Sequence, residues 1–507
     1  MVTNIHLHLL RTKIMLDFTD METKRLCDIV NVGAGNRLND REFLERELSK
    51  WLTCKQRRFQ MISDGYYDYE QAIKLKKRMV IADGGKMAVD PHLPNNRFID
   101  NRYADMVDQK VNYLLAKPLT FKTDNQAYAD ALKLIFNKSF YKTFKNLGKD
   151  TYNGGIGWLY PYYDEQGNFK IRKFKPYEIL PFWTDDDHTQ LDFAVRYYEM
   201  LGYQGHIEHV YKFVEVYDTK GIHRFTYENG GLRPDYQTYY FERPDLNGEL
   251  IPYNWDRVPL IAFKANDNET SLLKKCKSLQ DGINEILSNF GDGMQENASG
   301  NSVLVLKNYG GENLGEFRRN LSQYKAVKVT TVDGADGGVD TLQIEVNAQN
   351  YLTILAELRK ALIHNCRGYD VDELKSAGSP NEMTIKSVYS QIDLDANELE
   401  TEFQASFEEL LWFVNQHLAN VGVGNFDNEK VEVIFDRDLM INESQVIQDV
   451  NASASLLSKR TLLSQHPWIT DVEKELKELD KEEQKQMEQF GNSQFIKPVI
   501  GDDDAEQ

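Results

Sequence analysis

The fold is decided by one stretch of the sequence, NAQNYLTILAELRKALIHNCRGYDVDELKSAGSPNEMTIKSVYSQIDLDANELETEFQASFEELLWFVNQHLANV (residues 347–421). This stretch predicts a helix, a polar loop and a second, much longer helix. Apolar residues of the first helix recur at steps of three and four, which places them on one face. Gly368 follows that helix and is suited to a left-handed C-terminal cap. The apolar face consists of Tyr351, Leu355, Leu358, Leu362 and Cys366.

The second helix begins at a capping signal and continues as a long apolar stripe. Ser379 and Pro380 fit the N-cap and the first helical position, and Glu382 completes a capping box. Apolar or small residues then recur at steps of three and four from Ile385 to Val421. This predicts a rod of roughly 55 Å, at about 1.5 Å per residue. The stripe is interpreted as core, so the candidate functional element is the polar loop between the two rods.

Composition predicts an elongated folded protein rather than a nucleic-acid-gripping or membrane protein. A chain of 507 residues is too long for one compact core, so two or more subdomains are expected. The net charge is −19 and the isoelectric point is about 5.1, which argues against a conventional basic phosphate-binding surface. A protein that surrounds DNA without gripping it remains compatible with this charge.

Cysteine usage and hydropathy give no sign of secretion, metal binding or membrane insertion. The four cysteines, Cys27, Cys54, Cys276 and Cys366, are widely spaced and form no CxxC pair, which fits a reducing compartment. No uncharged run is long enough to span a membrane. The first residues, MVTNIHLHLL, lack the pattern of a signal peptide.

The rest of the chain predicts a mixed α/β body followed by alternating helical and strand segments. Residues 41–80, 102–116 and 126–137 are expected to contain helices, and residues 157–263 are expected to be mostly β. Within the β region, YPYYDEQGNFKIRKF alternates apolar and polar residues on either side of residues 165–168, which predicts a hairpin. A helix should begin near residue 270 and loosen or end at Gly291-Asp292-Gly293. Further strands are expected at SVLVLKNY, AVKVTTV, TLQIEV and VEVIFD, and helices at 443–465 and 471–490.

No catalytic, metal or cofactor site is predicted. The sequence has no phosphate-binding GxxxxGK[ST] and no HExxH or GxSxG motif. The glycines at 154–157 predict a tight turn, and residues 185–188 a polar turn. His206 and His209 are poorly spaced for a shared metal on a strand. Asp393 and Asp395 are two apart and do not share a helical face.

A series of short strings, in order, resembles the portal proteins of tailed bacteriophages, in particular the branch typified by phages of Gram-positive bacteria. The similarity runs in order from about residue 60 to 490. The strings are YLLAKPLTFKTDN (113–125), GWLYPYYDEQGNF (157–169), FKPYEILPFWTD (174–185), AVRYY (194–198), RVPLIAFKAN (257–266), VLKNYGGEN (305–313) and GGVDTL (337–342).

The resemblance implies an α+β portal fold with a mixed α/β wing, a helical stem, a small α/β clip, a long wing helix and an α-helical crown. Mapped onto this chain, the parts are a mobile N-terminal arm (1–40), the first part of the wing (41–263), a stem helix (264–295), the clip (296–346), a second stem helix (347–366), the tunnel loop (367–382), the long wing helix and a strand (383–440), the crown (441–490) and an acidic tail (491–507).

The resemblance also implies a function without covalent chemistry. Portal proteins form a ring, normally a dodecamer, at one capsid vertex, and double-stranded DNA passes through its channel during packaging and ejection. The implied partners are terminase, a head-completion or adaptor protein, the scaffold protein and the major capsid protein. No membrane partner and no cofactor are implied. The implied location is the virion, after assembly in the host cytoplasm.

Three sets of charged residues are candidate contacts. The tunnel loop carries Asp370, Asp372, Glu373, Lys375 and Gly378, and would touch DNA weakly or pack on a neighbouring subunit. The stem bases Lys274, Lys275 and Lys277 would face DNA or form a solvated or intersubunit face. The clip bases Lys307, Arg318, Arg319, Lys325 and Lys328 would meet the motor or the adaptor.

Two other interpretations stay open from the residues alone. Scattered acidic residues would also suit a metal-dependent nuclease, and the many helices would suit a monomeric helical adaptor of the virion. Bases between Lys55 and Arg78 form either a solvated helical face or a contact with phosphates or an acidic neighbour.

Overall fold

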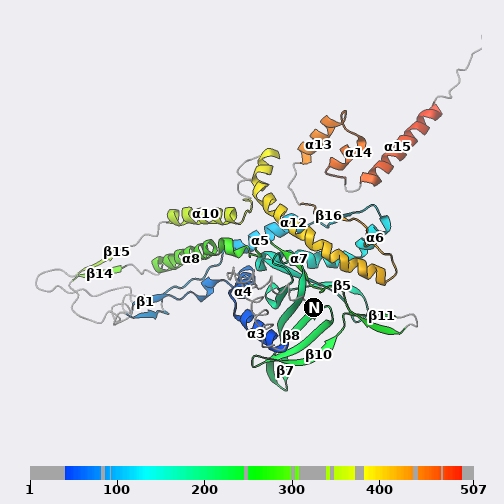
Figure 1. Cartoon of the computed structure of the whole chain (residues 1–507). Coiled ribbons are helices and arrows are strands. Elements are labelled where there is room, and N and C mark those ends of the chain that lie inside the picture. Colours follow the sequence, from blue (N-terminus) through cyan, green and yellow to red (C-terminus); the bar gives the residue numbers. More distant parts are fainter. Residues whose placement is uncertain are drawn as a thin grey trace, which may run out of the picture. The chain divides into compact units, whose positions relative to one another are not determined.

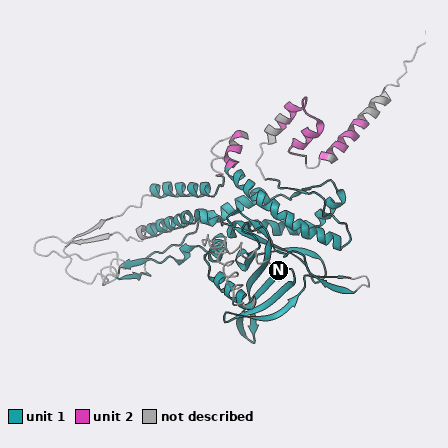
Figure 2. Ribbon diagram, in the orientation of Figure 1, with its two compact units in different colours: residues 1–369, 391–438 teal, residues 370–390, 439–507 magenta. Residues whose placement is uncertain are grey.

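The computed structural model describes residues 40–81, 86–91, 93–244, 249–298, 303–307, 338–342, 348–370, 382–437, 443–469 and 472–493. Within these residues the chain combines helices with small antiparallel sheets (Figure 1), so the α+β class is confirmed. The chain divides into two compact units, coloured separately in Figure 2. The first comprises Met1–Tyr369 with Gln391–Asp438, and the second comprises Asp370–Ser390 with Leu439–Gln507.

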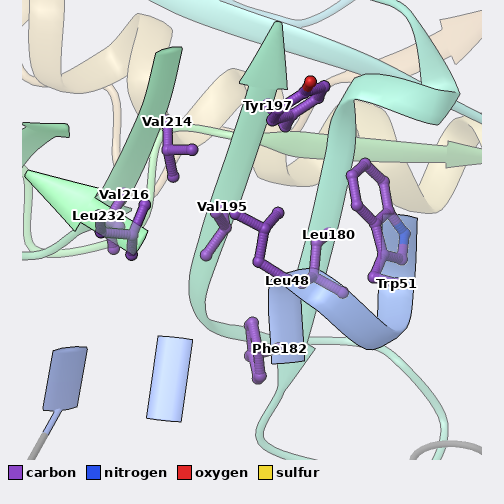
Figure 3. Close-up of a cluster of buried hydrophobic side chains, with 9 residues drawn as sticks. All are labelled: Leu48, Trp51, Leu180, Phe182, Val195, Tyr197, Val214, Val216 and Leu232. Carbon is purple, nitrogen blue, oxygen red and sulfur yellow. The ribbon is translucent and has the colours of Figure 1, made fainter. Parts of the chain in front are cut away.

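A five-stranded antiparallel sheet carries the first hydrophobic core. Its strand order is β10-β9-β8-β7-β6. The strands are β6 (Ile179–Trp183), β7 (Leu191–Gln204), β8 (Ile207–Asp218), β9 (Gly221–Glu228) and β10 (Gly231–Thr238). Helix α3 (Asp40–Thr53) places Leu48 and Trp51 against Leu180, Val195 and Val214 of this sheet (Figure 3). Helix α4 (Lys55–Tyr67) follows directly and is capped at its start by the Cys54 side chain.

A three-stranded sheet and helix α7 form the second part of the body. The strand order is β13 (Ile261–Lys264), β4 (Ile156–Tyr163) and β5 (Phe169–Phe174), and β4 and β5 form the predicted hairpin. Helix α7 (Lys138–Gly154) was not predicted from the sequence, and Gly155 is its C-cap. Gly155 has a φ of 81°, which confirms a tight turn in this glycine cluster.

Helix α12 (Glu382–Asn420) is the predicted long rod, and its apolar stripe is core. Residues Ile392, Ala396, Leu399, Phe403, Phe407, Leu410, Val414 and Leu418 of the stripe are all buried. The ring of Phe407 lies 5.2 Å from that of Phe144 on α7, and the ring of Phe403 lies 5.0 Å from that of Phe263 on β13. These edge-to-face contacts fix α12 across the body. The strand pair β3 (Thr120–Lys122) and β16 (Glu432–Ile434) connects the segments before α6 (Gln126–Ile135) and after α12.

Helices α8 (Leu273–Ala298) and α10 (Ala348–Asn365) lie side by side (Figure 1). The prediction that α8 loosens or ends at Gly291-Asp292-Gly293 is wrong, because the helix continues to Ala298 and Asp292 is anchored by hydrogen bonds described below. Between these helices, β14 (Val303–Lys307) pairs with β15 (Gly338–Leu342). The last strand of this segment therefore begins at Gly338 and not at Thr341, where TLQIEV begins.

The described residues of the second unit include the helices α13 (Glu443–Ser453), α14 (Lys459–Gln465) and α15 (Val472–Ser493). The predicted helix 443–465 is thus two helices, because Ser458 caps a new helix by accepting a hydrogen bond from the Thr461 amide. An ion pair between Lys459 and Glu483 joins α14 to α15. The other elements of the described residues are η1 (Ala72–Leu75), β1 (Met79–Ile81), β2 (Met87–Val89), α5 (Arg102–Leu115), η2 (Pro176–Glu178), β11 (Phe241–Pro244) and β12 (Leu250–Tyr253).

Candidate functional site

Helix α8 has a buried polar face made of residues spaced four apart. This set, called the polar ladder below, consists of Gln280, Asn284, Ser288 and Asp292, all of them buried. Four-residue steps keep side chains on one helical face, where successive groups lie about 6 Å apart along the axis. Buried polar groups are costly unless they are hydrogen-bonded, so a partner is required along the whole face.

The partner is the backbone leading into α5, residues 93–101, called the strap below. Every second N–H of the strap is bonded, which is the alternation of an extended chain and matches the spacing of the ladder. The four N–H donors, with their donor-to-acceptor distances, are Asn96 to Asp292 Oδ1 (2.6 Å), Phe98 to Ser288 Oγ (3.0 Å), Asp100 to Asn284 Oδ1 (3.0 Å) and, at the start of α5, Tyr103 to Gln280 Oε1 (3.0 Å).

The strap also contacts α10, and the ladder itself contacts the basic segment that precedes the strap. Arg359 of α10 donates to the Asp100 carboxylate at 2.9 and 2.7 Å. Lys76 lies 3.0 Å and Arg78 3.6 Å from the buried Asp292 carboxylate. Of the interpretations offered for the bases between Lys55 and Arg78, contact with an acidic neighbour is therefore correct for these two residues.

The turn after α10 differs in detail from its prediction. Arg367, not Gly368, has the left-handed conformation, with a φ of 52°. The N–H of Gly368 donates to Ile363 O and that of Arg367 to His364 O, which is the Schellman pattern with Arg367 at C′. Gly368 instead allows a close approach of α5, since an added Cβ would lie 2.6 Å from Met106 Sδ and 2.8 Å from Gln109 Oε1 and would displace these side chains.

The three stem lysines have different surroundings at the start of α8. Lys274 and Lys275 are exposed, so their ammonium groups are available to an acidic partner. Lys277 is half-buried and forms an ion pair with Asp281 at 2.7 Å, with its ammonium 5.0 Å from the centre of the Tyr66 ring. Its charge is therefore partly neutralised within the chain.

Most residues of the other two predicted sets lie outside the described residues. In the loop set, Asp370 is described and half-buried, whereas Asp372, Glu373, Lys375 and Gly378 fall outside. In the clip set, Lys307 is on β14, whereas Arg318, Arg319, Lys325 and Lys328 fall outside.

The described part of the chain holds no group of three or more His, Cys, Asp or Glu placed to bind a metal ion. Asp393 and Asp395 serve different partners, as their spacing predicts: Asp393 accepts from Tyr113 and Asp395 from Tyr152. Among the described helices, none has the length and apolar character needed to cross a membrane.

Comparison with known proteins identifies the family. A family model described as "Phage portal protein, SPP1 Gp6-like" matches residues 50–489. The portal protein of Bacillus phage SPP1 is 30% identical over 448 residues, which cover 87% of this chain and 86% of that protein. The portal protein of Clostridium phage phiCD119 is 26% identical over 441 residues, which cover 85% and 93%. The predicted resemblance is confirmed, and the chain belongs to the SPP1 Gp6-like family of phage portal proteins.

Proposed function

We propose that copies of this portal protein close into a ring, twelve in the capsid, whose channel passes double-stranded DNA during packaging and ejection. The observation that carries the proposal is the family match over residues 50–489. It is supported by the paired helices α8 and α10, which offer a rigid wall element. The net charge of −19 also suits a wall that does not hold DNA tightly.

The parts of the chain take the roles that the resemblance implies. In this proposal residues 41–263 and 383–440 are the wing, 264–295 and 347–366 the stem, and 296–346 the clip, with α8 reaching Ala298. Residues 367–382 are the tunnel loop and residues 441–490 the crown. The polar ladder and the strap then brace the stem on the wing side, because they bond α8 to the chain that leads into α5.

A conduit must confine DNA sideways and let it slide lengthwise. Neutralising many phosphates would give strong, salt-dependent binding and would brake the movement. Sparse contacts avoid this. In the proposal, exposed Lys274 and Lys275 supply such contacts on the stem, while Lys277 is occupied by Asp281. The loop residues Asp370, Asp372, Glu373, Lys375 and Gly378 would line the narrowest part of the channel.

Partners follow from the same role. The clip bases Lys307, Arg318, Arg319, Lys325 and Lys328 would dock terminase during packaging and the head-completion protein afterwards. Scaffold and major capsid protein would meet the ring during assembly in the host cytoplasm. The portal would catalyse no covalent step, and the motor would supply the energy for DNA movement.

Measuring the mass of the purified chain tests the ring. A ring of twelve copies of 58.8 kDa would have a mass of about 0.7 MDa, and negative-stain images should show a central channel. A monomer, or an open filament without a channel, would refute the proposal.

Two sets of variants test the local assignments. Rings carrying Asp372→Ala with Lys375→Ala should package DNA at an altered rate or to an altered length. Rings with the clip bases reversed to Glu should fail to dock terminase or the head-completion protein. Normal packaging or normal docking by intact variant rings would contradict the respective assignment.

A further inference from the structure

Helix α5 carries one side chain that satisfies both backbone groups of a residue in the turn after α10. Gln109 Nε2 donates to Tyr369 O at 2.9 Å, and Gln109 Oε1 accepts from Tyr369 N–H at 3.0 Å. A single amide thus fixes the peptide groups on both sides of Tyr369. The contact is close because Gly368 beside it has no Cβ to meet Met106 and Gln109.

The next residue of α5 is a buried lysine that joins this turn to α12. Lys110 Nζ lies 2.6 Å from Asp395 Oδ2 and donates to Arg367 O at 3.3 Å. The Lys110 side chain is fully buried, and burial lowers its pKa, an effect that the carboxylate of Asp395 opposes. The turn after α10 and the middle of α12 therefore share one cation.

The two residues that contact the Lys110 ammonium group, Asp395 and Arg367, also bond to other residues. Tyr152 of α7 donates its hydroxyl to Asp395 Oδ2 at 2.9 Å. Arg367 additionally reaches Glu398 of α12 at 3.1 Å on the exposed side. The Lys110–Asp395 pair thus belongs to a satisfied network that spans α5, α7, α12 and the turn after α10.

Stability alone does not account for a buried ion pair. Replacing such a pair by neutral side chains of similar volume is often neutral or stabilising, whereas removing one partner is costly. What a buried pair adds over apolar packing is directional geometry, because it is satisfied in only one arrangement of the groups around it.

We propose that Gln109 and Lys110 are positioning residues that set the turn 366–369, and that the Lys110–Asp395 pair couples this turn to α12. The network then holds the C-terminal end of α10 in a fixed position on α12 while DNA passes. This inference rests on the proposed channel function, although the coupling itself can be measured without DNA.

The decisive variant is Lys110→Met combined with Asp395→Asn, which removes both charges but keeps an acceptor for Tyr152. Lys110→Met alone should lower the melting temperature by roughly 5 °C or more, since it strands a buried carboxylate. The double variant should melt within about 2 °C of the parent, because no charge remains buried and unpaired. Hydrogen exchange at the amides of residues 366–369 should nevertheless be at least tenfold faster in the double variant.

Phage assembled with the double variant should yield at least tenfold fewer DNA-filled particles than the parent. Gln109→Leu, which removes both bonds to Tyr369, should give the same exchange result. Lys149→Met serves as a matched control, because Lys149 is a bonded lysine on α7 that pairs with Asp108 and does not touch the turn. It should change neither the exchange at 366–369 nor the particle yield.

If the amides of residues 366–369 exchange at the same rate in the double variant as in the parent, the coupling is refuted. A normal yield of DNA-filled particles despite faster exchange would also refute it. These outcomes differ from failure of the channel function, which would appear as a parent chain that forms no ring.

Discussion

At the scale of single residues, Glu409 is an acid held where its charge is unfavourable. It is half-buried on α12, and burial raises its pKa to about 7, with Arg257 acting in the opposite direction. Arg257 itself is positioned over the Trp412 ring, 4.7 Å from its centre. The protein therefore carries a carboxyl group that loses its proton near neutral pH in the folded chain and near pH 4.5 in the unfolded chain.

The sign of the resulting pH dependence follows from proton binding. Between about pH 4.5 and 7 the folded chain binds the proton and the unfolded chain does not, so stability falls as pH rises. We expect Glu409→Gln to raise the free energy of unfolding by about 1–3 kcal/mol at pH 8 and to change it little at pH 4.5. Thermal melts of both proteins at the two pH values measure this.

Glu408→Gln is the control for Glu409→Gln, because the neighbouring Glu408 is exposed and the charge change is identical. Its effect should be small and alike at both pH values. An effect of Glu409→Gln that is equally large at pH 4.5 would contradict the assignment.

Single residues also show where a local prediction goes wrong. The position of the turn after α10 was predictable, because Gly368 follows the last apolar step. The residue with positive φ was not, since Arg367 takes the left-handed conformation while Gly368 is reserved for the approach of Met106 and Gln109. That approach comes from α5, far away in sequence, and leaves no local signal. Lys110 was missed for the same reason.

At the scale of elements, two of the glycines in helix α8, Gly282 and Gly291, have opposite packing requirements. A Cβ on Gly291 would overlap the Phe98 ring of the strap and lie 3.3 Å from Asn96 Nδ2. A Cβ on Gly282 would meet only Leu358 Cδ1, at 3.9 Å, which is ordinary contact. The two positions share a helix, so helix propensity is common to both and only the packing differs.

We expect Gly291→Ala to lower the free energy of unfolding by about 1–3 kcal/mol through overpacking against the strap. Gly282→Ala is the matched variant and should raise it by up to about 1 kcal/mol, since alanine favours the helix. Denaturant unfolding of the two variants measures the difference. Equal effects of the two substitutions would show that the strap does not press on Gly291.

Elements were predictable where their signal was local. Helices α10 and α12 were found from apolar residues at steps of three and four, and the β4–β5 hairpin from its turn and alternation. Helix α7 was not assigned, and its buried face includes Gly148, which lies against Leu115 and Val111 of α5. The polar ladder was missed because its partners are N–H groups of the strap almost two hundred residues earlier in the chain.

At the scale of the whole molecule, the formal charge of −19 predicts that the proposed ring binds DNA weakly. Few stem residues are proposed to contact DNA. The sequence predicted all three lysines as contacts, because the ion pair that distinguishes Lys277 from Lys274 and Lys275 is seen only in the folded structure. Weak binding with a shallow dependence on salt is expected from so few contacts.

We expect assembled rings to bind DNA weakly, with log K falling gently against log salt concentration. Lys274→Ala with Lys275→Ala should flatten this slope by about 1 or more, because each lost phosphate contact removes roughly 0.9 from it. Fluorescence anisotropy over a salt series measures the slope. Lys138→Ala with Lys142→Ala removes the same charge from exposed positions on α7 and should leave the slope unchanged. A slope unaffected by the stem variant would remove these lysines from the channel wall.

The strap bonds to the polar ladder mainly through its backbone N–H groups. Substitutions should therefore be tolerated differently in the strap and in the ladder. Phe98 gives its N–H to Ser288 while 48% of the residue is exposed. Many side chains could therefore occupy position 98 across generations of phage, with proline the exception because it has no N–H to give. Ser288, whose hydroxyl receives that N–H, has far fewer acceptable replacements, so sequence drift should be greater at position 98 than at position 288.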